Sequence, residues 1–263
     1  MRRVSLFLML MLFGARLLAQ DLPEKLYLVF ELMHVDNEQE SAYAETENFW
    51  EKIHQQRVAD GEILGWDWWS LLPGGEDQNY QYLTVTIFDD PIKMFQATDL
   101  MATAKKAYPN MTDQELNQKF TATVKSRDLS VRIFIDQIAT TKDNFKMAPG
   151  IVAVINMMKV DLNNYSAYEK AETEVFQPMH QKEVDAGKRG HWALGRFMVP
   201  IGSATYASHI TVDMYKDMAQ ALGNPQGGGD SNLTAAEQMA ITNGLATRDL
   251  KFANVATLLK MVR

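Results

Sequence analysis

One helix-to-strand segment occurs twice in this chain, and this repetition constrains the fold more than any other feature. Residues 49–69 read FWEKIHQQRVADGEILGWDWW, and residues 176–197 read FQPMHQKEVDAGKRGHWALGRF. Because internal repetition reveals the structural unit of a chain, the sequence predicts one helix-to-strand unit that is used twice. A histidine, a glycine and a tryptophan lie at the same offsets in both copies: His54 and His180, Gly61 and Gly187, and Trp66 and Trp192.

The first copy has the element order β-α-β-β-α-β. Apolar and β-branched residues predict strands at 26–35, 64–72, 80–88 and 129–138. Helical spacing, a proline at a first turn and a capping box predict helices over 38–60, 91–107 and 112–125. This order is the ferredoxin-like split unit, in which four strands form one antiparallel sheet with the helices on one face.

The same order begins again after a polar linker that ends in Pro149-Gly150. Strands are predicted at 151–160, 193–199 and 206–215, and a second capping box begins at Thr234. Residues 223–231 are a glycine-rich insertion. The predicted organisation is therefore a signal segment at residues 1–20, a ferredoxin-like repeat at 26–140, a linker at 141–150 and a second ferredoxin-like repeat at 151–263.

The first twenty residues have the layout of a cleaved secretory signal peptide. Two arginines precede an apolar run that is followed by short residues. The run over residues 4–13 is too short to span a bilayer permanently, which takes about 20 apolar residues. We therefore expect a periplasmic or secreted protein without stable membrane insertion. A retained N-terminal anchor is the alternative.

Charge and cysteine content exclude several classes of function. Removal of the predicted signal takes away three arginines and no acid, and the formal net charge moves from −7 to −10. An acidic protein is a poor partner for nucleic acid or an anionic lipid surface. The chain has no cysteine, which excludes disulfides, thiol chemistry and cysteine-ligated metals. The sequence also lacks a phosphate loop, a nucleophile elbow and a zinc motif.

A ferredoxin-like sheet must bury the face that its helices leave open, and a second copy on the same chain is the expected partner. In this element order and duplication, residues 26–263 resemble the dimeric α+β barrel superfamily, which includes antibiotic-biosynthesis monooxygenases, NIPSNAP-like proteins and EthD-like proteins. The resemblance implies an α+β fold in which two tandem ferredoxin-like (βαββαβ) repeats form a pseudo-dimeric α+β barrel in an exported bacterial protein. It also implies ligand cavities between sheet and helices or inside the barrel. This fold hosts many functions and does not name an activity.

The two repeated histidines are candidates for ligand contact, and His180 is also a candidate acid or base. The alternative is a half-buried histidine that ties its helix to a neighbouring strand. Glu51 lies three residues before His54 and suggests a carboxylate metal site, but Gln177 takes its place in the second copy. We therefore expect no metal site.

Tryptophans on the second strand of each copy are candidates for an aromatic ligand wall: Trp66, Trp68 and Trp192. Strand alternation places Trp66 and Trp68 on one face and Trp69 on the other. The alternative is plain core packing.

The first strand of each copy has a polar residue in its middle, Glu31 in one and Asn156 in the other. A polar side chain among apolar neighbours needs a partner if it is buried, so Glu31 is a candidate ligand contact. Some members of the resembled superfamily have a functional asparagine on this strand. The resemblance therefore makes Asn156 a catalytic candidate.

A polar set occurs on two strands of the second copy that should be adjacent. His209, Thr211 and Asp213 share one face by strand alternation, and Arg196 lies on the neighbouring strand. These residues predict a polar cavity in which His209 acts as acid or base while Arg196 and Asp213 contact ligand. The alternative is a solvated sheet edge or a structural ion pair.

An arginine-aspartate pair precedes the last strand of each copy, as Arg127-Asp128 and Arg248-Asp249. We interpret each pair as a local charged clasp between a helix end and a strand.

These residues lead to three hypotheses for the function. The leading one is an exported protein that binds a small apolar or aromatic molecule between sheet and helices. The competing one is a monooxygenase-like or haem-dependent oxidoreductase, and the third is a structural or protein-interaction module. No histidine lies in a motif that specifies haem, so the cofactor stays open. A homodimer is permitted, because fused copies can still associate through outer surfaces.

Overall fold

Eight strands form one closed barrel, and every pair of neighbouring strands is antiparallel. The computed structural model describes residues 25–73, 79–223 and 233–263, so the predicted signal segment and most of the glycine-rich insertion lie outside the described residues. Around the barrel the strand order is β1-β3-β2-β8-β5-β7-β6-β4. The strands are β1 (Tyr27–His34), β2 (Gly65–Leu72), β3 (Tyr82–Phe88), β4 (Asp128–Thr140), β5 (Val152–Lys159), β6 (His191–Val199), β7 (His209–Tyr215) and β8 (Asp249–Val262).

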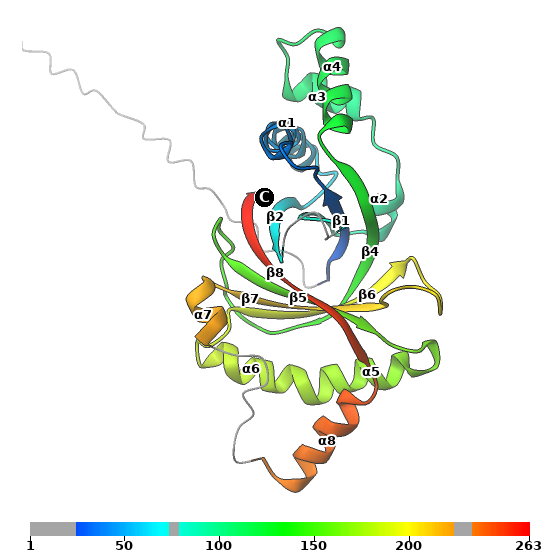
Figure 1. The fold of residues 1–263 in the computed structure, drawn as a ribbon, viewed down its shortest axis with the longest axis vertical. Coiled ribbons are helices and arrows are strands. Elements are labelled where there is room, and N and C mark those ends of the chain that lie inside the picture. Colours follow the sequence, from blue (N-terminus) through cyan, green and yellow to red (C-terminus); the bar gives the residue numbers. More distant parts are fainter. Residues whose placement is uncertain (1–24, 74–78, 224–232) are drawn as a thin grey trace, which may run out of the picture.

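The helices lie outside the barrel in two groups, one at each end of the long axis (Figure 1). The first group is α1 (Glu40–Ala59), α2 (Pro91–Phe95), α3 (Leu100–Ala107) and α4 (Asp113–Lys125). The second group is η1 (Leu162–Asn164), α5 (Tyr165–Ala171), the π turn η2 (Glu172–Phe176), α6 (Gln177–Asp185), α7 (Met218–Gly223) and α8 (Ala235–Leu245). The segment from α5 through η2 to α6 is one continuous helical run.

Each half of the chain supplies four neighbouring strands of the barrel. The first half contributes the order β4-β1-β3-β2, and the second contributes β8-β5-β7-β6. The halves join where β2 pairs with β8 and where β4 pairs with β6. This architecture confirms the predicted mixed α+β barrel. The origin of the halves as tandem ferredoxin-like repeats stays a prediction.

The two predicted capping boxes are present, whereas one predicted helix is broken. Thr112 and Thr234 each exchange hydrogen bonds with the glutamate three residues later, and these boxes begin α4 and α8. The helix predicted over 91–107 is instead two helices, α2 and α3. The Asp99 carboxylate accepts a hydrogen bond from the Ala102 amide and so starts a new helix at this point.

One apolar cluster draws side chains from all eight strands and therefore lies inside the barrel. It includes Leu83, Ile135 and Leu258, each at most 1% exposed. Side chains on the alternate strand positions point outward beneath the helices. Trp69 belongs to the inner cluster, while Trp66 and Trp68 pack with Tyr43 of α1, which confirms the predicted opposite faces. Candidate sites on the outer face are thus enclosed between sheet and helix.

No helix in the described parts of the chain is both long and apolar enough to span a membrane.

Candidate functional site

The outer face of the second half carries a buried polar cluster centred on Asn156 of β5. The strand pairing places Asn156 opposite Thr211 of β7, with Asp213 two residues further on the same face. The Asn156 amide nitrogen donates to Thr211 Oγ1 at 3.2 Å and to Asp213 Oδ2 at 3.0 Å. The side chain is 5% exposed, and its carbonyl oxygen Oδ1 has no hydrogen-bond partner within the protein. Buried polar atoms usually have a partner, so Asn156 is a candidate ligand contact, although Trp68 Nε1 and Trp69 Nε1 of the described residues also lack one.

The cluster continues through ion pairs to the helical layer. Arg189 precedes β6, is 4% exposed, and pairs with the carboxylate of Asp213. The same guanidinium donates to Glu183 Oε2 of α6 at 2.7 and 3.0 Å. Glu183 Oε2 in turn lies 4.0 Å from His180 Nδ1. A chain of polar groups therefore links Asn156 on the sheet to His180 on the helix.

His209 and Arg196 converge on Glu169 of α5, as their adjacent strands predict. His209 is fully buried, with Nε2 3.1 Å from Glu169 Oε1 and Nδ1 3.0 Å from Ser208 Oγ. Arg196 donates to the same Glu169 oxygen at 3.0 Å. Burial lowers the pKa of His209, and the hydrogen bond to Glu169 opposes this effect. Of the two alternatives, the solvated sheet edge is wrong for His209 and Asp213, since both are buried. The structural ion pair is present for Asp213 with Arg189 and for Arg196 with Glu169.

Each repeated histidine stacks on the tryptophan of the next strand. His54 lies 4.9 Å from Trp66 with an interplanar angle of 15°, and His180 lies 5.0 Å from Trp192 at 26°. Burial lowers the pKa of both imidazoles, so both are neutral at pH 7. This arrangement ties each helix to a strand, as the structural alternative describes. Ligand contact by either histidine stays a prediction.

The outer face of the first half is aromatic where the second half is polar. Tyr43 contacts Trp68 at 5.6 Å and Tyr82 at 4.7 Å between ring centroids. Trp66 is 1% exposed and Trp68 is 7% exposed. These side chains pack against one another, so the predicted aromatic wall is occupied by protein atoms in this conformation.

Glu31 occupies the strand position that Asn156 has in the other half. Its carboxylate pairs with Arg132 of β4 at 2.6 Å and accepts a long hydrogen bond of 3.4 Å from Thr84. The Arg132 side chain is 51% exposed and the Glu31 side chain 22%. The first half therefore satisfies this polar position with a surface ion pair.

A buried tyrosine-glutamate-arginine cluster occurs in both halves, and sequence reasoning missed it. Arg127 pairs with Glu47 beside Tyr43, and Arg248 pairs with Glu172 beside Tyr168. Burial raises the pKa of Glu47 to about 7 although Arg127 opposes the shift. The predicted local clasps of Arg127 with Asp128 and Arg248 with Asp249 are thus wrong. The missed signal was a tyrosine four residues before a glutamate on the first helix of both copies.

The π turn η2 explains a change in spacing between the halves. Glu47 and Glu172 are 125 positions apart, whereas His54 and His180 are 126 apart. The extra residue of the second half falls in η2, which spans Glu172–Phe176. A π turn accommodates one inserted residue and is frequent at functional sites. It lies in the helical layer of the half that holds Asn156.

Two hollows on the described surface lie away from these residues. One runs along α4 and is lined by residues such as Gln114, Gln118 and Lys125. The other is lined by Pro91, Ile92, Phe95 and Gln96 around α2. Neither includes a candidate site residue. Asn156 is itself 5% exposed, so a ligand reaches it only if side chains that cover it move.

The described residues contain no group of three or more histidine, aspartate and glutamate side chains placed to hold a metal ion. Haem also does not fit His54 or His209 as they are arranged. Both ring nitrogens of His209 are bonded to protein groups, and the His54 ring lies between Trp50 and Trp66. An axial ligand needs a free nitrogen beside an open plane. We therefore derive no chemical step through haem.

Comparison with known proteins shows a shared fold at low sequence identity. No protein-family model matches the sequence, and no curated protein sequence matches it. A "Putative monooxygenase" of Fusobacterium nucleatum aligns at a TM-score of 0.55 and 13% identity, over 91% of this chain and 94% of that one. An anthrone oxidase-like protein aligns at 0.54 and 10%, over 91% and 93% of the chains.

A "putative monooxygenase" of Lactobacillus acidophilus aligns at a TM-score of 0.50 and 9% identity, over 91% of this chain and 96% of that one. At such identities the likeness shows the fold alone. The chain shares the fold of these structures, and in this chain that fold is a closed eight-stranded antiparallel barrel with helices outside it.

Proposed function

We propose that the second half of this chain binds one small aromatic molecule that carries a hydroxyl or N–H group. The molecule lies between β5 and β7 on one side and the helical run of α5, η2 and α6 on the other. The observation that carries this proposal is the buried Oδ1 of Asn156, which lacks a partner. Leaving such an acceptor unsatisfied costs about 1–3 kcal/mol, so a ligand that donates a hydrogen bond to it gains affinity.

The difference between the halves supports one ligand for each chain. The first half packs Tyr43 against Trp68 and Tyr82 and pairs Glu31 with Arg132, whereas the second half packs the corresponding Tyr168 against His209. The second half keeps Asn156 buried beside Thr211 and Asp213. In this proposal Asn156 accepts the ligand's hydrogen bond, and Trp192 and His180 form the nearest aromatic wall.

We also propose that the protein is exported and arose by tandem duplication of a ferredoxin-like unit. The twenty-residue N-terminal segment supports export. The matched histidine-tryptophan stacks and tyrosine-glutamate-arginine clusters support duplication, because unrelated halves would not place both sets at corresponding positions.

The second candidate function is monooxygenase-like oxidation of such a molecule by molecular oxygen. The polar, asymmetric character of the Asn156 cluster favours it, since catalysis needs acid-base groups that a binding wall does not. His180, His209 and Asn156 are its candidate catalytic residues. His209 is bonded at both nitrogens, so it must release Glu169 or Ser208 before it can accept a proton. Consumption of dissolved oxygen by the pure protein with a phenolic substrate would distinguish this function from binding.

Trp192 makes the binding proposal directly testable, because it is the one tryptophan in the second half of the sequence. Four of the five tryptophans lie at positions 50, 66, 68 and 69, and Trp192 is the fifth. In protein labelled with 5-fluorotryptophan, the Trp192 fluorine resonance is assigned by Trp192→Phe. The probes are 1-naphthol, which donates a hydrogen bond, and naphthalene, which does not.

We expect 1-naphthol to shift the Trp192 resonance with saturation at one molecule per chain. Naphthalene should bind about tenfold more weakly, because it leaves Asn156 Oδ1 unpaired. Asn156→Leu should remove this preference while the Trp66 resonance keeps its position. Equal binding of both probes, or a shift at Trp66 and none at Trp192, would refute the proposal. Native mass spectrometry of the protein from its own source would then identify a bound natural ligand.

A further inference from the structure

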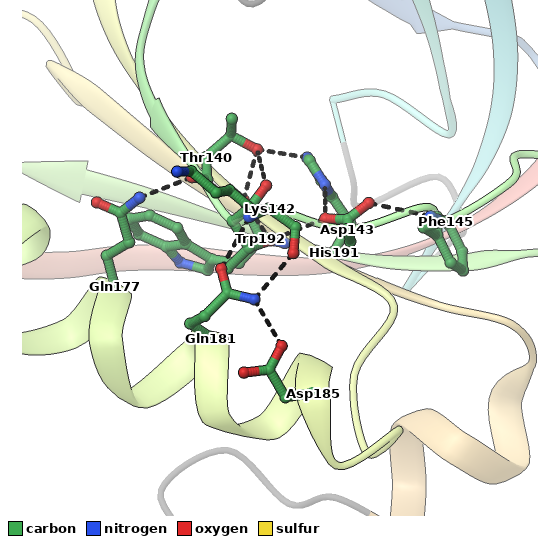
Figure 2. A network of polar contacts seen from close by, with 10 residues as sticks. Thr140, Lys142, Asp143, Phe145, Gln177, Gln181, Asp185, His191 and Trp192 are labelled. Carbon is green, nitrogen blue, oxygen red and sulfur yellow. Dashed lines mark hydrogen bonds and ion pairs between the residues drawn. The ribbon is translucent and has the colours of Figure 1, made fainter. Parts of the chain in front are cut away.

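A threonine, a histidine and an aspartate form a hydrogen-bonded series at the junction of the two halves (Figure 2). Thr140 ends β4 and His191 begins β6, and the pairing of these strands brings them together. Thr140 Oγ1 lies 3.1 Å from His191 Nε2, and His191 Nδ1 lies 2.7 Å from Asp143 Oδ2. This site is separate from the Asn156 cluster, and none of the three residues was a sequence candidate.

The order of these groups is hydroxyl, imidazole and carboxylate. An imidazole that receives a hydroxyl proton at one nitrogen and donates to a carboxylate from the other is the arrangement of an activated nucleophile. Burial acts to raise the pKa of Asp143, but the interactions with His191 and the hydrogen bonds from the Phe145 amide and Thr141 together outweigh it and hold that pKa below its usual range. Asp143 is therefore ionised at neutral pH and fixes the tautomer that leaves His191 Nε2 as the acceptor.

Neighbouring hydrogen bonds hold all three groups in place. Asp143 also accepts from Thr141 Oγ1 and from the Phe145 amide, both at 3.0 Å. Gln177 of α6 donates to the Thr140 carbonyl oxygen at 2.6 Å. Gln181 of α6 bonds both the amide and the carbonyl of Lys142 at 2.8 Å, as Figure 2 shows. Such support preorganises a reactive group.

The site is open enough to meet a small reagent. Thr140 is half-buried, and 23% of the His191 side chain and 11% of the Asp143 side chain are exposed. The Thr140 hydroxyl also lies 3.1 Å from the Trp192 carbonyl oxygen, which competes with His191 for its proton. Because of this competition, we expect the Thr140 hydroxyl to react slowly as a nucleophile.

We propose that Thr140 is a nucleophile that accepts an acyl group from activated esters, with His191 as its general base and Asp143 as a positioning residue. Thr140 Oγ1 attacks the ester carbonyl carbon as His191 Nε2 takes the hydroxyl proton. The ester carbon-oxygen bond then breaks, and His191 returns the proton to the departing oxygen. The products are an acyl-threonine and an alcohol or phenol, and the step needs no oxidant or reductant.

The test is reaction of the full-length mature protein with p-nitrophenyl acetate, followed by intact mass and peptide mapping. We expect one acetyl group per chain, on Thr140. Thr140→Ala should abolish the label, and Thr140→Ser should restore it. His191→Ala should slow labelling by about a hundredfold, since general-base assistance is worth at least that much. Asp143→Asn should slow it, and Asp143→Glu should recover part of the rate.

Thr173→Ala is the matched control, because Thr173 is a helical threonine whose hydroxyl bonds only backbone carbonyl oxygens. It should label at the normal rate. A melting curve of each variant separates a lost nucleophile from a lost fold. Acetylation of lysines or of a histidine instead of Thr140, or equal labelling of folded His191→Ala, would overturn the proposal.

Discussion

The two halves of the barrel share a framework but differ on the outer face beneath their helices. Both halves stack a helical histidine on a strand tryptophan, and both bury a tyrosine-glutamate-arginine cluster. The halves diverge at three matched strand positions. Glu31, Tyr82 and Thr86 of the first half correspond to Asn156, His209 and Asp213 of the second.

This difference distinguishes the residues that hold the fold together from the residues that are candidates for function. Features present in both halves connect helix to sheet in the same way and are explained by packing. Features confined to the second half bury polar groups that packing does not require, and such groups are costly unless each has a partner. The asymmetric positions are therefore where a ligand or a reaction is best sought, and the following changes test that division.

The largest effect should come from removing Arg189. Arg189→Ala leaves the carboxylate of Asp213 buried without its cation, and we expect a loss of about 3–5 kcal/mol in the free energy of unfolding. The change in the first half chosen for comparison is Arg132→Ala, which removes the partner of Glu31. That pair is half-exposed, so its loss should cost about 1 kcal/mol or less. Urea denaturation of both variants measures the difference. Similar values for the two would mean that the halves do not differ in buried charge.

The repeated histidines should show an intermediate effect. His54→Ala opens a space between Trp50 and Trp66 in a region that is almost fully buried, and we expect a cost of about 2–3 kcal/mol. The His180 side chain is 22% exposed and stacks on one tryptophan, Trp192. His180→Ala should therefore lower the free energy of unfolding by about 1 kcal/mol.

Melting temperature and 1-naphthol binding should be measured on both histidine variants. If His180→Ala abolishes binding at unchanged stability, the second histidine belongs to the site. If His54→Ala lowers the melting temperature as little as His180→Ala does, the packing of His54 against Trp50 and Trp66 contributes less to stability than we infer.

The last effect concerns pH. The folded pKa of Glu47 is raised to about 7 from its ordinary value of 4.5. Between these values the folded protein holds a proton that the unfolded chain releases, so the Glu47 contribution to stability is present at low pH and is lost as pH rises through this window. As pH rises from about 4.5 to 7, the free energy of unfolding should therefore fall less for Glu47→Gln than for the native protein.

Denaturation midpoints at several pH values provide the measurement for Glu47. Glu45→Gln, on the exposed face of the same helix, is the control and should follow the native curve. A Glu47→Gln curve parallel to the native one would show that Glu47 is ionised throughout this range.

Local patterns in the sequence predicted most elements of the fold. The apolar and β-favouring composition of β1 and β7 and the capping boxes at Thr112 and Thr234 depend on residues within a few positions of one another, which a sequence displays directly. The interruption between α2 and α3 was missed because Asp99 was read as one residue of a helical run rather than as a cap.

The candidate site was predicted only in part. His209 and Asp213 were candidates from strand alternation, Arg196 from the neighbouring strand and Asn156 from the family resemblance. Their strands are adjacent as expected. Glu169 and Arg189, which complete the polar contacts, come from a helix and a turn that carry no distinguishing pattern. Arg127 was assigned to its neighbour Asp128, whereas its partner Glu47 is 80 positions away.

The sequence by itself determined the order of most strands and helices and which of the candidate strand residues share a face, because these follow from short-range periodicity. Only the tertiary structure decided which charges meet across the helix-sheet layer, since that depends on how helices pack over the closed barrel. It also decided that Asn156 Oδ1 is left without a partner and that Thr140, His191 and Asp143 come together. The second outcome arises because chain folding brings His191 within about 3 Å of Thr140 and Asp143, which are distant from it in sequence.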